Sequence, residues 1–229
     1  MDRQNITVVD KAIAIFCKPP KKGYVKTRLA ADTDEEFALR IYEILLRKIL
    51  IQLDAFNQMD KTVDIYYYIS DADRSEFERF LSDNLLLSRD KFLRVQNGSD
   101  LGERIKKAFE ELFSNNYQKV IIIGSDILGD LVYNITIAFE YLKKSNYVVG
   151  PSFDGGFYLI GANRSFDEEL FNGITWSSNN VLNKLKDNLH GKLYSYRLLD
   201  TLLDVDRYED LIKGIQMGIL DKNLLYRSK

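Results

Sequence analysis

The chain contains few of the residues on which many catalytic and structural sites depend. Its 229 residues include one cysteine, Cys17, and one histidine, His190. A single cysteine excludes an internal disulfide framework, and together with a single histidine it cannot form a Cys/His zinc site. Catalysis would therefore rest on carboxylates, lysines, arginines, hydroxyls, backbone amides or a bound metal ion. The absence of disulfides favours a reducing, cytoplasmic compartment.

An excess of one charge and long hydrophobic runs are also absent. Lys and Arg number 32 against 34 Asp and Glu, so the formal net charge is −2, and both signs are spread along the chain. This balance offers no broad positive surface for nucleic acid or acidic membranes. No apolar run approaches the ~20 residues of a membrane helix, and residues 1–5 lead into a strand-like segment rather than a signal peptide. We expect no nucleic-acid partner and no membrane span.

The composition is that of a globular protein. Hydrophobic residues make up 45% and charged residues 29% of the chain, which allows a sizeable buried core. Proline occurs three times, and no repeat, low-complexity tract or linker is visible. We therefore expect a single domain over residues 1–229.

Apolar runs and helical periodicities alternate along the chain. The runs predict strands at 12–17, 63–69, 92–96, 119–123, 147–150, 157–160 and 193–199. The periodic stretches predict helices at 33–53, 73–81, 100–112, 131–142, 178–189 and 208–219. Capping boxes are predicted at Thr33 with Glu36 and at Asp100 with Glu103. This order predicts an α/β protein with a mainly parallel sheet and helices on both faces.

A basic loop follows the first predicted strand. Residues 18–28 combine two prolines and Gly23 with four lysines and Arg28. Ligands of open parallel sheets bind beyond the carboxyl ends of the strands, and cations at that place suit phosphates. The glycine spacings of a Walker A loop or a dinucleotide fingerprint are absent. A solvated basic turn is the alternative interpretation.

A carboxylate follows the predicted central strand directly. Gly124, Ser125 and Asp126 stand at the end of a strongly apolar run, where a charged group needs a partner. Mg²⁺ or Mn²⁺ would provide one, because these ions accept one protein carboxylate together with substrate phosphates. Asp126 could instead only cap the following helix.

Two further acidic segments lie near predicted strand ends. Asp154 precedes Gly155 and Gly156, which would let the backbone approach a ligand, and its carboxylate could bind a metal, take a proton or fix a sugar hydroxyl. An ordinary turn is the alternative. Asp204 and Asp206 lie on one side of an extended segment and could share a metal position. We favour Asp206 as the cap of the last helix, with Glu209 completing a capping box.

Several other side chains have two interpretations. Arg104, near the start of a predicted helix, could reach an anion, and Trp176 could stack on an acceptor, although core packing is favoured for it. For Cys17 a buried core position is favoured over a nucleophile, because no helix N-terminus or charged partner is evident. For His190 a favourable charge at a helix C-terminus is favoured.

Six sequence blocks in order resemble one family. They are Phe16-x-Lys18-x-Pro20-x-x-Gly23-x-Val25-Lys26-Thr27-Arg28-Leu29, Gln96-x-Gly98-x-Asp100-Leu101-Gly102-Glu103-Arg104, Gly124-Ser125-Asp126-Ile127, Gly150-Pro151-x-x-Asp154-Gly155-Gly156-Phe157-Tyr158-Leu159-Ile160-Gly161, Phe171-x-Gly173-Ile174-x-Trp176-Ser177 and Asp204-Val205-Asp206. Over about residues 12 to 212 the chain resembles the small glycosyltransferase-A-fold family of nucleotide-diphospho-sugar transferases, which includes proteins assigned to arsenosugar biosynthesis. It is more distantly similar to phospholactate guanylyltransferases and molybdenum-cofactor nucleotidyltransferases.

The resemblance implies a three-layer α/β/α Rossmann-like (GT-A) fold whose N-terminal half holds a nucleotide. It implies that Lys18, Lys26 and Arg28 contact phosphates, that Asp126 holds Mg²⁺ or Mn²⁺, and that residues 154–156 line the side where donor and acceptor meet. We expect Lys26 and Arg28 to act in catalysis, and Asp154 to activate the acceptor or to be a second metal ligand. The residues implied in nucleotide or substrate binding are Lys18, Gly23, Lys26, Thr27, Arg28, Gly98, Asp100, Arg104, Ser125, Gly155, Gly156 and Trp176.

The chain also departs from the family pattern. Relatives usually place a proline soon after the metal-binding aspartate, where this chain has Leu128-Gly129. Relatives also have an Asp-x-Asp-Thr-Pro run. In this chain Asp204 and Asp206 are followed by Arg207-Tyr208 in place of Thr-Pro.

Our hypothesis from the sequence is a metal-dependent transferase that moves a sugar from a nucleoside diphosphate sugar to a small-molecule acceptor. The alternatives are nucleotidyl transfer from an NTP with release of pyrophosphate, and a nucleotide-binding module without turnover.

Overall fold

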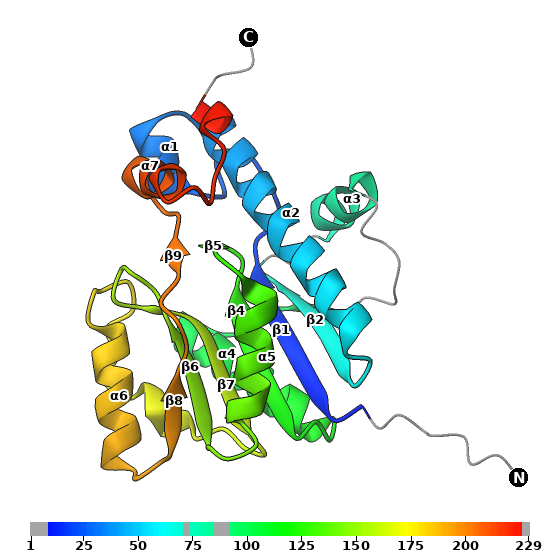
Figure 1. Ribbon diagram of the computed structural model, residues 1–229, viewed down its shortest axis with the longest axis vertical. Coiled ribbons are helices and arrows are strands. Elements are labelled where there is room, and N and C mark those ends of the chain that lie inside the picture. The colour runs from blue at the N-terminus through cyan, green and yellow to red at the C-terminus, as the bar shows by residue number, and fades with distance from the viewer. Residues whose placement is uncertain (1–8, 71–73, 85–91, 226–229) are drawn as a thin grey trace, which may run out of the picture.

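The computed structural model describes residues 9–70, 74–84 and 92–225. A seven-stranded sheet in the order β3-β2-β1-β4-β7-β6-β8 forms its centre (Figure 1). These strands are β1 (Lys11–Cys17), β2 (Val63–Ile69), β3 (Phe92–Val95), β4 (Lys119–Gly124), β6 (Tyr147–Pro151), β7 (Phe157–Asn163) and β8 (Tyr196–Leu198). A separate pair joins β5 (Ile127–Leu128) and β9 (Leu203–Asp204).

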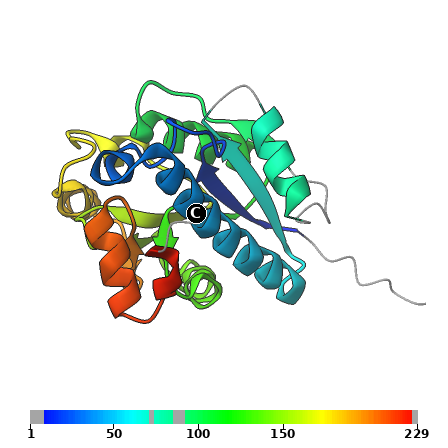
Figure 2. The same cartoon turned by 90° about the horizontal axis from the view of Figure 1, so that it is seen from above.

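Helices cover both faces of the sheet (Figure 2). They are α1 (Thr27–Asp32), α2 (Glu35–Met59), α3 (Ser75–Asp83), α4 (Leu101–Ser114), α5 (Leu131–Tyr141), α6 (Val181–Gly191) and α7 (Tyr208–Gln216), with the 3-10 turns η1 (Glu168–Phe171) and η2 (Lys222–Leu225). None of the helices in the described ranges is both long and apolar enough to cross a membrane.

Strand directions confirm the predicted α/β class and its mainly parallel sheet. Strands β3, β2, β1 and β4 are parallel neighbours, and β8 runs parallel to β6. Only β7 runs against its neighbours β4 and β6 within this sheet. The connection from β6 to β7 is a short turn through residues 152–156, and a parallel crossover needs a dozen residues or more. The short turn therefore forces β7 to be antiparallel.

The sheet separates two apolar layers. Ile13 and Ile15 of β1 face the layer formed with α2, α3 and α5, whereas Ala12 and Ala14 face the layer formed with α4 and α6. This alternation follows from the two-residue period of a strand. Because both faces are covered, β1 reads in the sequence as a continuous apolar run.

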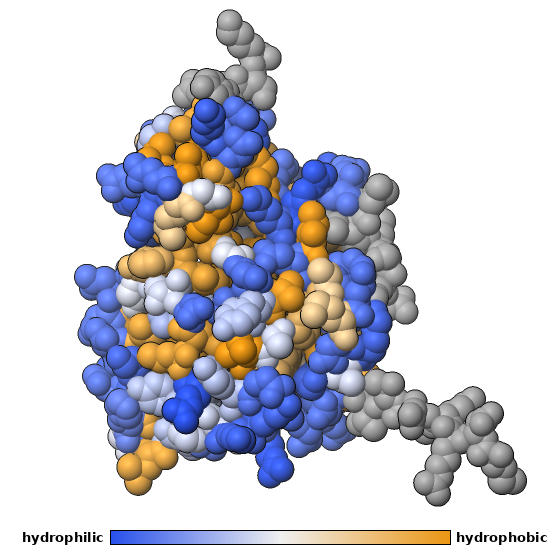
Figure 3. Space-filling view, viewed as in Figure 1, coloured by the Kyte–Doolittle hydropathy of each residue, from blue (hydrophilic) through white to orange (hydrophobic). Residues whose placement is uncertain are grey.

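A third apolar cluster forms a cap above the carboxyl ends of the strands. Leu29 of α1, Phe37 of α2, Leu128 of β5, Leu203 of β9 and Leu211 of α7 pack together there. Figure 2 shows α1 and α7 close together in this cap, and Figure 3 shows apolar residues gathered on the surface over the same part of the molecule. The cap fixes the segments that carry the site residues over the edge of the sheet.

Two of the predicted helix starts are wrong. The cap of α2 is Asp34, whose carboxylate accepts a hydrogen bond from Phe37 N at 2.8 Å. The Thr33 hydroxyl donates to Leu29 O at 2.7 Å instead, because Thr33 ends α1, a helix that the sequence did not predict. Helix α6 begins at Val181 rather than at 178. The predicted helix start at 73 lies outside the described residues.

The packing of α4 on the sheet should contribute strongly to stability. Phe109 is fully buried and stacks on Phe166, with ring centroids 4.5 Å apart, and on Phe113 at 5.9 Å. We expect Phe109→Ala to lower the free energy of unfolding by about 3–5 kcal/mol, because it leaves a cavity that the rigid sheet cannot close. Urea unfolding would measure the loss. The exposed Tyr133 on α5 provides a control, because Tyr133→Ala should cost about 0.5 kcal/mol or less.

The single cysteine is buried, as predicted. Cys17 is 2% exposed at the end of β1, and burial, followed by the negative charge of Asp126, raises the pKa of its thiol. The reactive thiolate is therefore scarce at pH 8. We expect iodoacetamide to leave the native protein unmodified and to alkylate Cys17 once denaturant is added, as mass spectrometry would show. Full alkylation in native buffer would contradict this burial.

Candidate functional site

Loops from distant parts of the chain enclose a cavity at the carboxyl edge of the sheet. β1 and β4 are adjacent and parallel, so the loops that follow them lie side by side. They border a cavity of about 450 Å³, which we call the rim cavity. Among its lining residues are Lys18, Lys26, Thr27, Arg28, Arg104, Ser125, Asp126 and Asp206. Lys26, Arg28 and Asp126, which the sequence predicted to act together, therefore face one cavity.

Lys26 is the most deeply buried cation of the basic loop. Gly23 turns the loop in the left-handed region, and Val25 and Leu29 are buried on either side of Lys26. Lys26 itself has φ 48 and ψ 45 at the start of α1, and its side chain is 2% exposed. A non-glycine residue in this conformation is uncommon, so tertiary contacts must hold it there.

Three carboxylates surround the Lys26 ammonium. Its Nζ lies 3.0 Å from Asp126 Oδ2, 3.3 Å from Asp206 Oδ1 and 3.9 Å from Asp204 Oδ1. One oxygen from each aspartate lies within 4.8 Å of the others, and we call this group the acidic triad. Burial lowers the pKa of Lys26, but the charges of the acidic triad together outweigh burial and raise it.

Asp204 is the least compensated member of the acidic triad. Its Oδ1 is buried and has no hydrogen-bond partner among the described residues. Burial raises the pKa of Asp204 to about 8, Lys26 opposes this rise, and the neighbouring carboxylates add to it. A buried carboxylate oxygen without a partner is costly unless a cation or a proton satisfies it.

The pairing of β5 with β9 builds the acidic triad. Ile127 pairs with Asp204, and Val205 N donates to Asp126 O at 3.1 Å, so residues about 78 positions apart meet. The prediction that Asp206 caps α7 with Glu209 is wrong. The helix starts after Arg207, and the Asp210 carboxylate accepts from the backbone N–H groups of Asp206 and Arg207 at 3.1 and 2.8 Å. The side chain of Asp206 is thereby left to face Lys26.

Arg28 joins the acidic triad from the solvent side. Its Nη1 lies 3.0 Å from Asp206 Oδ2, and its side chain is 51% exposed. An exposed ion pair of this kind contributes only about 0–1 kcal/mol, so Arg28 can exchange this partner for another anion at little cost.

Tyr42 of α2 contacts both the loop that follows β1 and the loop that follows β4. The sequence did not reveal this role. Its buried hydroxyl donates to Lys18 O at 2.9 Å, accepts from Lys18 N at 2.9 Å and lies 3.4 Å from Ser125 Oγ. Burial raises the pKa of Tyr42, so it remains a neutral donor. In the sequence it is one of several apolar positions with helical spacing, and no signal distinguishes it from them.

The start of α4 forms another wall of the rim cavity. Asp100 caps this helix as predicted and accepts from Glu103 N at 2.8 Å, while the Glu103 carboxylate accepts from Ser99 N rather than from Asp100. Arg104 Nε donates to Gly98 O at 3.1 Å, and its side chain lines the cavity. Asp100 itself lies outside the lining, beside a second cavity of about 650 Å³.

Asp154 lies outside the acidic triad, but its charge is close enough to contribute to the raised pKa of Asp204. The exposed Asp154 accepts hydrogen bonds from Ser152 Oγ and from Gly156 N at 2.9 Å, which closes its own turn. Gly155 has φ +87, and a Cβ there would lie 2.1 Å from Asn179 O. A glycine is therefore needed at position 155 for the close packing of this turn against Asn179, independently of any ligand. The roles of Asp154, Gly155 and Gly156 toward a ligand stay predictions.

Trp176 packs against the start of α4. A Cβ at Gly102 would lie 2.5 Å from its ring, and Phe171 meets the ring edge-on with centroids 5.3 Å apart. The indole is half-buried and borders the second cavity rather than the rim cavity. This contact agrees with a packing role, and stacking on a ligand stays a prediction.

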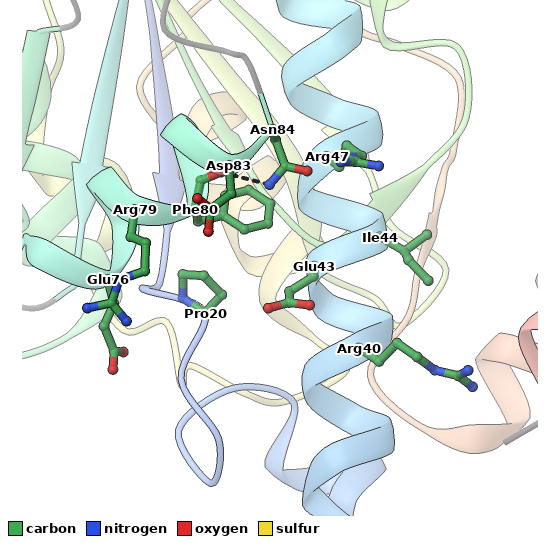
Figure 4. A pocket seen from close by; sticks show the side chains of 10 residues that line it. All are labelled: Pro20, Arg40, Glu43, Ile44, Arg47, Glu76, Arg79, Phe80, Asp83 and Asn84. Atoms are coloured by element: carbon green, nitrogen blue, oxygen red, sulfur yellow. Dashed lines mark hydrogen bonds between the residues drawn. The ribbon is translucent and has the colours of Figure 1, made fainter. Parts of the chain in front are cut away.

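A third cavity, of about 440 Å³, lies between α2 and α3 beside Pro20 (Figure 4). Arginines and acids alternate around it, and none of the residues that line it also lines the rim cavity. Its mixed charge gives no sign of a particular ligand.

Comparison with known proteins places the chain in a family. The model of a family described as "Uncharacterized protein conserved in bacteria (DUF2064)" matches residues 53–178, more than half of the chain. The chain belongs to the DUF2064 family. No curated protein matches its sequence.

Solved structures confirm the fold that the sequence resemblance implied. A proposed nucleotide-diphospho-sugar transferase from Desulfovibrio desulfuricans G20 superposes with a TM-score of 0.82 at 28% identity, over 94% of this DUF2064 chain and 90% of that one. CMP:2-keto-3-deoxy-manno-octonic acid synthetase complexed with CTP superposes with a TM-score of 0.51 at 7% identity, over 92% of this chain and 100% of that one. The second similarity shows the fold alone. The chain thus has the fold of nucleotide-diphospho-sugar transferases.

Proposed function

We propose that this DUF2064 protein is a metal-dependent transferase that moves a sugar from a nucleoside diphosphate sugar to a small-molecule acceptor. The observation that carries the proposal is the rim cavity, where four cationic side chains and two members of the acidic triad face the same space. Cations suit the diphosphate of such a donor, and the carboxylates suit a divalent cation. The D. desulfuricans protein, at 28% identity, is described as a transferase of this type, which supports the proposal.

The acidic triad has the ligands that Mg²⁺ or Mn²⁺ prefers. Asp126, Asp204 and Asp206 can each direct one oxygen to a common point, and Asp204 Oδ1, which has no hydrogen bond among the described residues, would gain a ligand bond there. Of the two predicted metal ligands, Asp126 belongs to this group and Asp154 does not. When bound, the ion would supply positive charge to the diphosphate as it leaves.

The basic residues would stabilise the same leaving group. In the proposed reaction the bond between the sugar carbon and the diphosphate oxygen breaks, and the acceptor oxygen forms the new bond. Negative charge grows on the departing diphosphate, and Lys26 and Arg28 would pair with it. Tyr42 holds the backbone of Lys18 by two hydrogen bonds, so that end of the basic loop is already ordered before the donor binds.

Asp154 is our proposed general base for the acceptor. It is exposed at the turn after β6, and the Gly156 N–H and Ser152 hydroxyl hold its carboxylate in one orientation. A carboxylate held in this way can accept the proton that the acceptor hydroxyl loses.

A product assay tests the proposal. The purified protein would be incubated with Mn²⁺, a panel of nucleoside diphosphate sugars and a panel of hydroxyl-bearing acceptors. We expect release of a nucleoside diphosphate. Release of pyrophosphate from an NTP would instead establish nucleotidyl transfer, and nucleotide binding without any product would indicate a binding module.

A further inference from the structure

The ammonium of Lys26 occupies the position that a divalent cation would need. It lies 3.0 Å from Asp126 Oδ2 and 3.3 Å from Asp206 Oδ1, between the carboxylates of the acidic triad. The facing oxygens lie within 4.8 Å of one another. Mg²⁺ binds oxygens at about 2.0–2.1 Å, so such an ion would sit among the same oxygens. An ammonium and a divalent cation cannot share this space, because they would both clash and repel each other.

The surroundings of Lys26 hold the ammonium in place. Its side chain is 2% exposed, its backbone is fixed in the left-handed region, and its neighbours Val25 and Leu29 are buried. A buried ammonium without a counter-charge is very costly. The ammonium can therefore leave the acidic triad only if another anion reaches it.

The rim cavity is where such an anion would enter. Lys18, Arg28 and Arg104 line the same cavity as Lys26, so their charges favour an anion there. A diphosphate in the cavity would offer its oxygens to the Lys26 ammonium and so replace the acidic triad as its partner.

We propose that Lys26 is an internal counter-ion that keeps divalent cations out of the acidic triad until a diphosphate enters the rim cavity. This inference rests on the proposed function and adds an order of binding to it. Without a diphosphate, the lysine neutralises part of the charge of the acidic triad and competes with the metal. With a diphosphate bound, the lysine pairs with phosphate, and the carboxylates become available. Metal and donor therefore strengthen each other's binding, and the coupling is reciprocal.

The experiment measures Mn²⁺ binding to the full chain without any nucleotide or phosphate, by the electron paramagnetic resonance signal of free Mn²⁺. We expect K26M to bind Mn²⁺ at least about tenfold more tightly than the wild type, because a competing positive charge is gone. K21M is the matched control, since Lys21 is an exposed lysine of the same loop and its replacement should leave the affinity unchanged. K26Q should behave as K26M does and decides the question if circular dichroism shows that K26M does not fold.

Two results would overturn the inference. One is equal Mn²⁺ affinity of the wild type and the Lys26 variants. This result would show that Lys26 does not compete with the metal, and it would not contradict the metal site itself. The other is a wild-type Mn²⁺ affinity that a saturating nucleoside diphosphate does not change, a measurement that needs no variant. Failure of the proposed function would look different, because the product assay would then release no nucleoside diphosphate, whereas the Mn²⁺ affinities of the wild type and the Lys26 variants would still differ.

Discussion

Replacing Asp126 with asparagine is expected to lower kcat/KM for donor-dependent transfer by about 100- to 1,000-fold. The substitution keeps the shape of the side chain but removes the charge of a carboxylate that contacts Lys26 at 3.0 Å and belongs to the acidic triad. Release of nucleoside diphosphate would measure turnover, and electron paramagnetic resonance would show weaker Mn²⁺ binding in the presence of nucleotide.

A matched control separates this effect from a general change of charge. Asp187 is exposed on α6, far along the chain from the acidic triad, and D187N makes the same chemical change. We expect its turnover to equal that of the wild type. Equal activity of D126N and the wild type would show that Asp126 takes no part in the reaction.

The second large effect is expected at Lys26, and here the affinities for metal and donor should change in opposite directions. K26M, which should bind Mn²⁺ more tightly alone, should bind a nucleoside diphosphate about 10- to 100-fold more weakly. The loss corresponds to about 1.5–3 kcal/mol for a hydrogen bond to a charged group. Calorimetric titration with UDP and GDP would measure it.

Arg28 makes the comparison sharper. Its side chain is half exposed, so R28M should weaken nucleotide binding less than K26M does, and it should leave Mn²⁺ binding without nucleotide near the wild-type value. If K26M weakened both ligands together, Lys26 would act as a structural support rather than as a competitor of the metal.

The main strands and helices could be predicted because each carries its own signal. β2 spans the predicted residues 63–69, and the end of the β4 prediction at 123 falls within one residue of the observed end. Their burial on both faces produces apolar runs that are visible without any tertiary information. Helix α1 and strands β5 and β9 have two to six residues each, too few for a periodic pattern, so no such signal exists for them.

The candidate site could be predicted only in part, for the same reason. Lys26, Arg28 and Asp126 follow predicted strands β1 and β4, so the rule that ligands bind at the carboxyl edge was enough to bring them together. Asp204 and Asp206 reach them only through the β5–β9 pairing. The local pattern before α7 favoured a cap at Asp206 with Glu209, but the N-cap is Arg207, and Asp210 takes the role predicted for Glu209. A local rule was thus overridden by a contact between distant segments.

The account depends most on a diphosphate and a divalent cation meeting between Lys26 and the acidic triad. Co-crystals of the full chain with a nucleoside diphosphate and Mn²⁺ would test this through the manganese anomalous difference map. We expect a manganese peak between the carboxylates of Asp126 and Asp206, with the Lys26 ammonium on the diphosphate. Nucleotide bound elsewhere, or Lys26 still paired with Asp126 beside a bound nucleotide, would contradict it.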